Sequence, residues 1–208
     1  MKLFNYDSPV FNLLSRLTDI GIVGLLWFFT SLPIVTMGAA TTAAYDVLIK
    51  IALDEDTEVV KKFFKSFVSN FLVSTAAFLL LVVIAALLVF NIRITDGASV
   101  LGWLILLFNY FLMYQVVIIA IYIFPLIAKF KMKFFQYIKQ ASFLGSRHLI
   151  SSVLHVILLL SLLLLATQFV LLLTVLMGIY CYLSSFIMVK IIRKHRPDFE
   201  TGEKGDES

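Results

Sequence analysis

Residues 61–91, the stretch that decides the fold, read KKFFKSFVSNFLVSTAAFLLLVVIAALLVFN. A short basic, Phe-rich amphipathic segment leads directly into an apolar run. The apolar part, Leu72 to Phe90, is long enough to cross a hydrocarbon core of about 30 Å. The same order returns at residues 129–160, which read KFKMKFFQYIKQASFLGSRHLISSVLHVILLL. We therefore expect a membrane protein built from two loosely repeated halves.

The composition supports this class. Of the 208 residues, 61% are hydrophobic and only 14% are charged, and the mean hydropathy is +1.00. Soluble chains usually carry about 25% charged residues. The length fits one bundle, so we expect a single transmembrane helical domain at 1–192 and a disordered cytoplasmic tail at 193–208. The net charge of +4 is typical of cytoplasmic loops that face anionic lipid, and nucleic-acid binding is not expected.

The amino-terminal region predicts a helix from Pro9 and a retained first span that starts at Leu17. The apolar run continues to Met37, which exceeds the roughly 7–15 residues of a signal peptide. Pro33 should end or kink this helix near Leu32, because proline lacks a backbone donor. A second, shorter helix is expected to reach about Leu53. Its small and hydroxyl residues suit either a broken helix that lines a polar cavity or, as we favour, tight packing against neighbouring spans.

After an acidic turn at residues 54–56, one face of the next segment is apolar and the other is basic. This pattern predicts an interfacial helix with aromatic side chains at the acyl boundary and lysines toward the headgroups, with a docking site as the alternative. The apolar face comprises Val60, Phe63, Phe64, Phe67 and Phe71, and the polar face Lys61, Lys62, Lys65 and Ser69. A second such helix is expected after Pro125, with Phe134, Phe135, Ile138 and Ala141 opposite Lys131, Lys133, Lys139 and Gln140.

Three further spans complete the expected fold. A third span runs from about Val100 to Phe124, where Pro125 should interrupt it, and the fourth and fifth lie within Leu149–Ile192 with a break near Thr167–Gln168. Four polar residues of the third span are expected to face the bundle: Asn109, Tyr110, Tyr114 and Gln115. The predicted fold is an all-α polytopic bundle of about five spans, with basic amphipathic interfacial helices before the second and fourth.

The distribution of cations predicts the orientation in a plasma membrane. With the fifth span ending inside, fourteen Lys and Arg lie in cytoplasmic segments, and only Lys2, Arg16 and Arg93 lie outside. The positive-inside rule then places the carboxyl terminus in the cytoplasm and the amino terminus outside. A variant keeps the amino terminus inside, with the two segments that flank Pro33 forming a re-entrant hairpin.

Four motifs carry a resemblance to a known family. They are SLPIVTMGAATTAAY at Ser31–Tyr45, FFKSFVSNF at Phe63–Phe71, IYIFPLIAKF at Ile121–Phe130 and SRHLISSVL at Ser146–Leu154. In this order they resemble the YesL family of small bacterial membrane proteins, a domain family of unknown function, over nearly the whole chain. Members often sit beside ATP-binding-cassette sugar transporters, so the resemblance implies a link to carbohydrate uptake. It supplies no catalytic or ligand residues.

Few residues point to chemistry. His148, His155 and His195 have no carboxylate or thiol at metal-ligand spacing, and no phosphate-binding loop or nucleophile motif is present. We therefore expect no enzyme activity, metal or cofactor, and single Cys181 predicts no disulfide within the chain. His155 is ionisable within a span, which makes it a candidate binding residue unless it is a neutral imidazole hydrogen-bonded to a neighbouring helix. The candidate binding residues are Pro33, Gly38, Thr41, Thr42, Tyr45, Asp46, Asn109, Tyr114 and His155.

Three functions remain open. The first is a non-enzymatic accessory component that contacts the permease subunits of a sugar transporter. The second is a small autonomous transporter with helices broken at Pro33 and Pro125. The third is a structural protein that interacts with anionic lipid. A homo-oligomer is compatible with each of the three.

Overall fold

The computed structural model describes residues 9–53, 58–97, 99–147, 152–158, 161, 177–187 and 189. Over these residues the chain is helical, as predicted, with no strand. The acidic turn at 54–57, most of the predicted fourth and fifth spans with their break, and both chain ends lie outside the described residues. The elements are α1 Pro9–Ser31, η1 Ile34–Thr36, α2 Met37–Ala52, α3 Val59–Ile94, α4 Val100–Lys129 and α5 Phe134–Arg147, followed by helices Ser152–Leu158 and Met177–Ile187.

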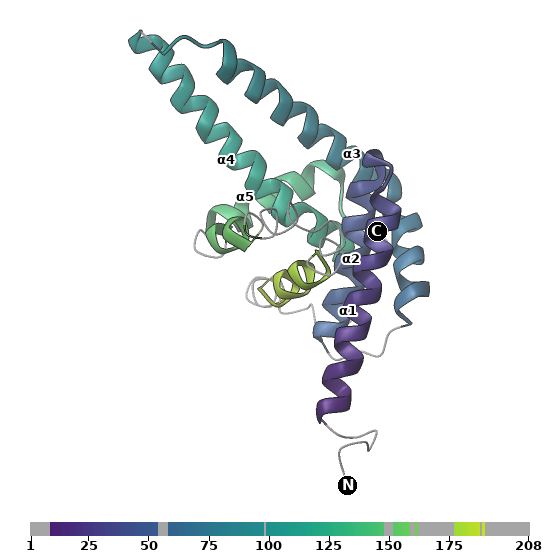
Figure 1. The fold of residues 1–208 in the computed structure, drawn as a ribbon. Coiled ribbons are helices and arrows are strands. Elements are labelled where there is room, and N and C mark those ends of the chain that lie inside the picture. Colours follow the sequence, from purple (N-terminus) through teal and green to yellow (C-terminus); the bar gives the residue numbers. More distant parts are fainter. Residues whose placement is uncertain are drawn as a thin grey trace.

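The helices α1 and α2 form an antiparallel hairpin (Figure 1). The prediction that Pro33 breaks the chain is confirmed, because α1 ends at Ser31 and α2 starts only after the short helix η1. The helix α2 then runs back beside α1, and α3 starts again at the same end (Figure 1). The amino-terminal end of α1 therefore lies at the end where α2 finishes and α3 begins, an arrangement that agrees with the re-entrant variant.

The sequence predicted that the basic segment of residues 61–71 forms a separate interfacial helix. This prediction is wrong, because the segment is the first part of the 36-residue helix α3. No glycine or proline occurs between Val59 and Ile94, so propagation of the helix costs less than a break. Phe63 was predicted to face the lipid but is fully buried against α2, whereas Phe64 is exposed. The start of α3 therefore has three faces, one buried, one apolar and exposed, and one basic, and not only the apolar and basic faces that the sequence predicted.

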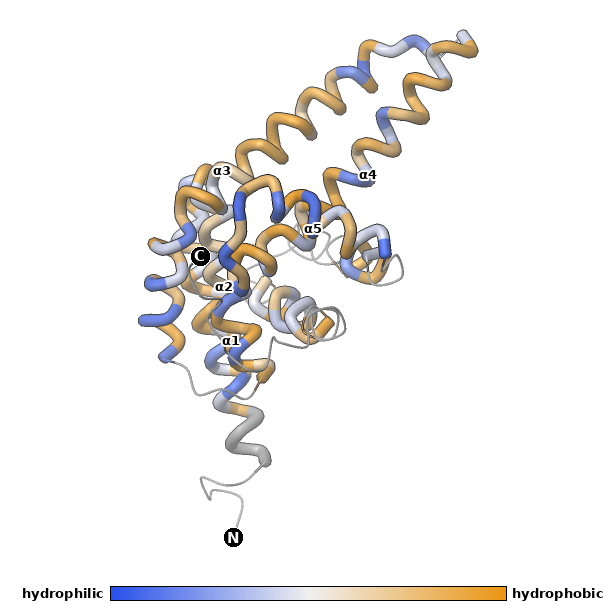
Figure 2. Tube along the Cα trace, turned by 180° about the vertical axis from the view of Figure 1, so that it is seen from behind, coloured by the Kyte–Doolittle hydropathy of each residue, from blue (hydrophilic) through white to orange (hydrophobic). Residues whose placement is uncertain are grey.

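The helices α3 and α4 form a long hairpin that extends away from the other helices (Figure 1). Ser99 caps α4, its Oγ accepting a hydrogen bond from the backbone N–H of Gly102 at 3.0 Å. Between the two helices, Asn109 Nδ2 donates to Asn91 Oδ1 at 3.3 Å. Most residues of the hairpin are hydrophobic (Figure 2), and many of their side chains are exposed. A surface of this kind is stable in lipid and not in water.

Three helical segments are long and apolar enough to cross a membrane, namely 34–52, α3 and α4, and the bent pair of α5 with Ser152–Leu158 would be a fourth. These are candidates by length and composition among the described residues. They make the chain a multi-pass membrane protein. Only 17% of the apolar window of α3 is buried inside the structure, compared with 72% for residues 34–52.

Two expectations for the third span are wrong. Pro125 does not interrupt α4, which continues to Lys129. Each residue from Ile121 to Ile127 is buried, and this packing stabilises the helix although the proline ring removes one hydrogen-bond donor. Asn109 faces the interior as predicted, but the side chains of Tyr110 and Tyr114 are 59% and 40% exposed.

The second amphipathic helix is confirmed as a separate element, α5, although its buried face is shifted. Phe135 was predicted on that face but is 81% exposed, while Ala141 is buried as expected. The buried residues are Tyr137, Ala141, Leu144 and Gly145. Tyr137 fixes the start of the helix, because its hydroxyl donates to the carbonyl of Phe130 at 2.6 Å and accepts from the backbone N–H of Met132 at 3.0 Å.

Gly38 provides a test of the packing between α2 and α3. A Cβ at this position would lie 2.5 Å from the backbone oxygen of Ser74, whereas a Cβ at Gly21 would meet nothing within 4 Å. We predict that Gly38→Ala destabilises the protein by about 1–3 kcal/mol, because a backbone atom cannot move aside cheaply. The matched control Gly21→Ala should be neutral or stabilising by up to about 1 kcal/mol. Reversible unfolding in mixed detergent micelles measures both, and equal effects would contradict the close approach.

Candidate functional site

The candidate site is centred on α2, the most enclosed helix of the structure. All residues from Thr42 to Val47, and on to Ile49, are buried. One side of α2 faces α3, and Tyr45 on another side reaches the helix Met177–Ile187. Because α2 is surrounded, each polar group that it carries has to be hydrogen-bonded inside the protein.

The contact between α2 and α3, here called the α2–α3 seam, is made of small and hydroxyl residues. Gly38 lets the helices approach so closely that its Cα faces Ser74 and Phe78. One turn later, Thr42 Oγ1 and Ser74 Oγ form a buried hydrogen bond of 2.8 Å. This is the arrangement by which small residues and hydroxyls join helices in lipid. The favoured interpretation of the small-residue run, tight packing, is therefore confirmed at Gly38 and Thr42.

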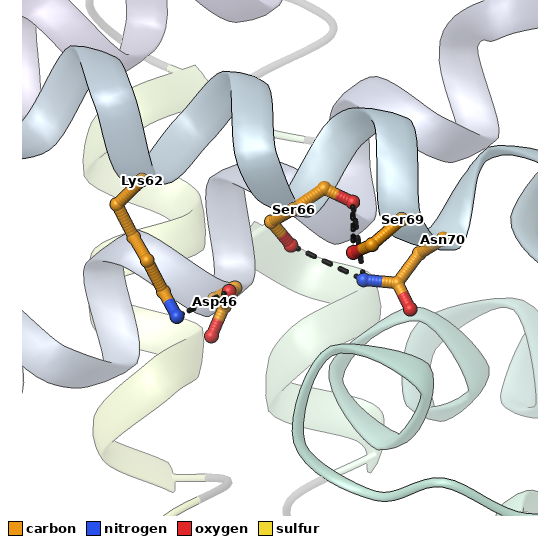
Figure 3. Close-up of polar contacts among 5 residues, drawn as sticks. All are labelled: Asp46, Lys62, Ser66, Ser69 and Asn70. Carbon is orange, nitrogen blue, oxygen red and sulfur yellow. Dashed lines mark hydrogen bonds and ion pairs between the residues drawn. The ribbon is translucent and has the colours of Figure 1, made fainter.

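Toward the start of α3 the seam becomes charged. Asp46 Oδ2 lies 3.3 Å from Lys62 Nζ, with the two side chains 10% and 29% exposed (Figure 3). Further along α3, Asn70 Nδ2 donates to the carbonyl of Ser66 at 3.1 Å and to its Oγ at 3.2 Å. Ser69 Oγ donates to the same carbonyl at 3.2 Å. Lys62 is thus paired with α2, while Ser66, Ser69 and Asn70 are bonded to one another within α3.

A second polar group, the Tyr45–Ser184–His155 relay, joins three elements that lie far apart in the sequence. Tyr45 Oη donates to Ser184 Oγ at 2.9 Å, and Ser184 Oγ lies 2.8 Å from His155 Nε2. All three side chains are almost fully buried. The serine oxygen can accept from tyrosine and still donate to an imidazole nitrogen that carries no proton. The relay therefore joins α2 to the helices Ser152–Leu158 and Met177–Ile187.

Two tyrosine rings flank His155. The ring of Tyr122 lies 5.9 Å from the imidazole and that of Tyr180 lies 6.4 Å away, the latter at 90°. Tyr122 also binds Ser152, with 3.2 Å between the hydroxyl oxygens, and Ser152 Oγ donates to the carbonyl of Gly145 at 3.0 Å. These contacts bring α4, α5 and the helix Ser152–Leu158 to the same place.

Close backbone contact places the helix Met177–Ile187 against α1. A Cβ at Gly178 would lie 2.6 Å from the backbone oxygen of Ile20. Ser185 is equally buried but donates to the carbonyl of Cys181 at 2.7 Å, within its own helix. Ser184 is therefore the serine of this pair that bridges between helices.

The nine predicted binding residues do not form one site. Thr42 and Asp46 lie in the seam, Gly38 makes its close contact, and Tyr45 and His155 meet in the relay. Thr41 joins α2 to α1, since its Oγ1 accepts from Trp27 Nε1 at 3.1 Å. The other three lie elsewhere: Pro33 is exposed at the end of the hairpin, Asn109 pairs with Asn91 between α3 and α4, and Tyr114 is on the outside of α4.

Several residues of these two groups were not singled out in the sequence. Ser184 and Ser152 lie in apolar runs where a serine carries no local signal, and Tyr122 belongs to an aromatic-rich span. Lys62 was assigned to the headgroups, although its i, i+4 spacing to Ser66 and Asn70 could have marked a polar face. Over the described residues, no group of three or more His, Cys, Asp or Glu is placed to hold a metal ion. The two polar groups hold the helices to one another.

A family model of known proteins matches part of the chain. Residues 20–92 match the family model described as "Protein of unknown function, DUF624". The matched residues begin within α1 and stop just before the end of α3, so they include α2 and the whole α2–α3 seam. No curated protein and no solved structure matches the chain.

The contribution of the Asp46–Lys62 pair to stability can be tested by substitution, because Asp46 is more deeply buried than Lys62. We predict that Lys62→Met costs about 1–3 kcal/mol of stability, because it leaves the more buried carboxylate without its cation. Asp46→Asn should cost less, since the lysine can reach water, and the double variant should recover part of the loss. Lys61→Met is the control, because its pair with Glu58 is exposed on both sides, at 81% and 73%, and should matter by less than about 1 kcal/mol.

A Lys62→Met variant that unfolds no more easily than Lys61→Met would contradict a structural role for the pair. Unfolding curves in mixed micelles at one ionic strength provide the comparison.

Proposed function

We propose that the protein is a non-enzymatic accessory component of a bacterial plasma membrane, which binds the permease subunits of an ATP-binding-cassette sugar importer. The link to sugar uptake comes from the resemblance to the YesL family. The structural observation that supports a role in helix contacts is the α3–α4 hairpin, whose outer surface is left largely uncovered. The carboxyl terminus is placed in the cytoplasm, from the distribution of cations.

One face of α4 favours a protein partner over lipid alone. Four residues at three- and four-residue spacing lie in one stripe and are 67%, 69%, 59% and 40% exposed: Trp103, Leu107, Tyr110 and Tyr114. Neither tyrosine hydroxyl is hydrogen-bonded to a described residue. A hydroxyl within the hydrocarbon core is costly without a partner. A neighbouring transmembrane helix that offers a backbone carbonyl or a hydroxyl would satisfy both tyrosines.

A second candidate, an autonomous transporter, is favoured by the Tyr45–Ser184–His155 relay, because ionisable and hydroxyl groups inside a bundle are typical of substrate and proton paths. The third, lipid binding, is favoured by the exposed Lys61 and Lys65 on α3 and by Lys139 on α5. The basic and aromatic start of α3 and of α5 also supports the proposed relation between the two halves. A count of five crossings would require α1 to cross the membrane.

The proposed function predicts co-purification. In a mild-detergent pull-down from the native bacterium, sugar-permease subunits should be recovered in near-equal amount with the tagged protein. The double variant Tyr110→Ala/Tyr114→Ala should reduce this recovery about tenfold, as expected for a loss near 1.4 kcal/mol. The matched control is Phe108→Ala, which is 60% exposed on another face of α4 and should leave recovery unchanged.

Recovery of the protein alone, or an equal loss with Phe108→Ala, would contradict the accessory role. The transporter would then be the better proposal, provided that the purified protein in liposomes gives sugar-dependent flux. That flux should fall with Ser184→Ala and not with Ser185→Ala.

A further inference from the structure

The end of the α1–α2 hairpin exposes an apolar tip. Phe29, Leu32, Ile34 and Val35 are 63%, 64%, 71% and 50% exposed, around an exposed Pro33. No Asp, Glu, Lys or Arg occurs between Asp19 and Asp46. In water, a tip of this kind would expose a contiguous apolar patch, which soluble surfaces avoid.

The backbone of this tip is adapted to a medium without water. Near the end of α1, two hydroxyl groups donate to carbonyls one turn earlier in the same helix: Thr30 Oγ1 to Leu26 at 2.7 Å and Ser31 Oγ to Trp27 at 2.5 Å. The carbonyl of Thr30 is one of the last of α1, which have no partner within the helix, and Thr36 supplies a hydroxyl to it. Thr36 Oγ1 lies 2.5 Å from the carbonyl of Thr30 and 2.7 Å from that of Pro33. In hydrocarbon each unsatisfied carbonyl would cost several kcal/mol, and Ser and Thr side chains are one means of satisfying a broken helix there.

The depth of the tip follows from its contact with α3. Gly38, just after the tip, faces Ser74 and Phe78. Ser74 lies about 13 Å along α3 from Lys65 and about 28 Å before Arg93, at 1.5 Å per residue. Lys65 and Arg93 mark the two ends of the part of α3 that has no charged residue. The hairpin therefore ends far short of the Arg93 end.

The remainder of α3 has to lie in the membrane. Val83, Leu87 and Phe90 are 54%, 62% and 62% exposed, so this part of the hairpin cannot extend into water. A hydrocarbon core of about 30 Å that contains these residues has its far boundary near Arg93. Ser74, about 28 Å before Arg93, then lies close to the near boundary, so the tip of the α1–α2 hairpin lies in the leaflet on the Lys65 side and does not reach the opposite surface.

We propose that α1 and α2 form a re-entrant hairpin whose tip, Phe29 and Leu32–Val35, contacts lipid acyl chains within the leaflet on the Lys65 side. The amino-terminal end of α1 lies on the same side of the membrane as Lys61 and Lys65, and the carboxyl-terminal end of α3 lies on the other. This inference concerns insertion alone and does not depend on the proposed sugar-permease partner.

Single-cysteine labelling tests the inference. The only native cysteine, Cys181, is buried, so the native protein gives the background, and Cys181→Ala gives a second one. Single substitutions Ser15→Cys, Lys61→Cys and Ile94→Cys are treated with a membrane-impermeant maleimide on intact cells and on inside-out vesicles. We expect the first two to react from one face and the third from the opposite face.

Depth is measured with a nitroxide at Ile34→Cys in phosphatidylcholine and phosphatidylglycerol vesicles. The expected result is higher accessibility to oxygen than to a polar nickel complex, with a reference label on Val83→Cys giving a still larger difference because Val83 lies about 15 Å from the Arg93 boundary. A label at Ile34→Cys that reacts with the impermeant maleimide from either face would overturn the inference. So would labelling of Ser15→Cys and Lys61→Cys from opposite faces, which is the result that a crossing α1 predicts.

Discussion

The structure depends on the close approach of α2 and α3 at Gly38. With no side chain at this position, the backbone of α2 comes close to the carbonyl of Ser74, and this distance brings Thr42 and Ser74 into hydrogen-bond contact. In lipid there is no hydrophobic driving force for helices to associate, so van der Waals packing and interhelical hydrogen bonds have to hold them together. The seam supplies both. It also lies wholly within the residues that match the DUF624 family model.

Once α2 is fixed on α3, the positions of its other polar residues follow. Asp46 is two turns beyond Gly38 on the same side and meets Lys62, while Tyr45 points toward Ser184. The helix thus connects the first half of the chain to the Tyr45–Ser184–His155 relay in the second.

Local signals in the sequence predicted the elements whose causes are local. Pro9 marks the start of α1, Pro33 marks its end, and the polar residues near Asp96 mark the turn before α4. The amphipathic pattern of residues 61–71 gives way to a uniformly apolar one, and the sequence analysis took this change for the end of a helix. A helix can continue through such a change, as α3 does. Pro125 remained inside α4 because of surrounding packing, and the pairing of Tyr45 with Ser184 joins positions 139 residues apart. Contacts of that kind depend on how helices are placed, which no spacing rule describes.

The seam is tested most directly by a disulfide between Thr42→Cys and Ser74→Cys in a Cys181→Ala background. The two hydroxyl oxygens are 2.8 Å apart, so the replacing sulfur atoms should be close enough to bond. Mild oxidation of native membranes should give nearly complete cross-linking within one chain, seen as a shift in gel mobility that a reductant reverses. Cross-linking between chains, or none at all under conditions that oxidise both thiols, would contradict the packing of α2 on α3.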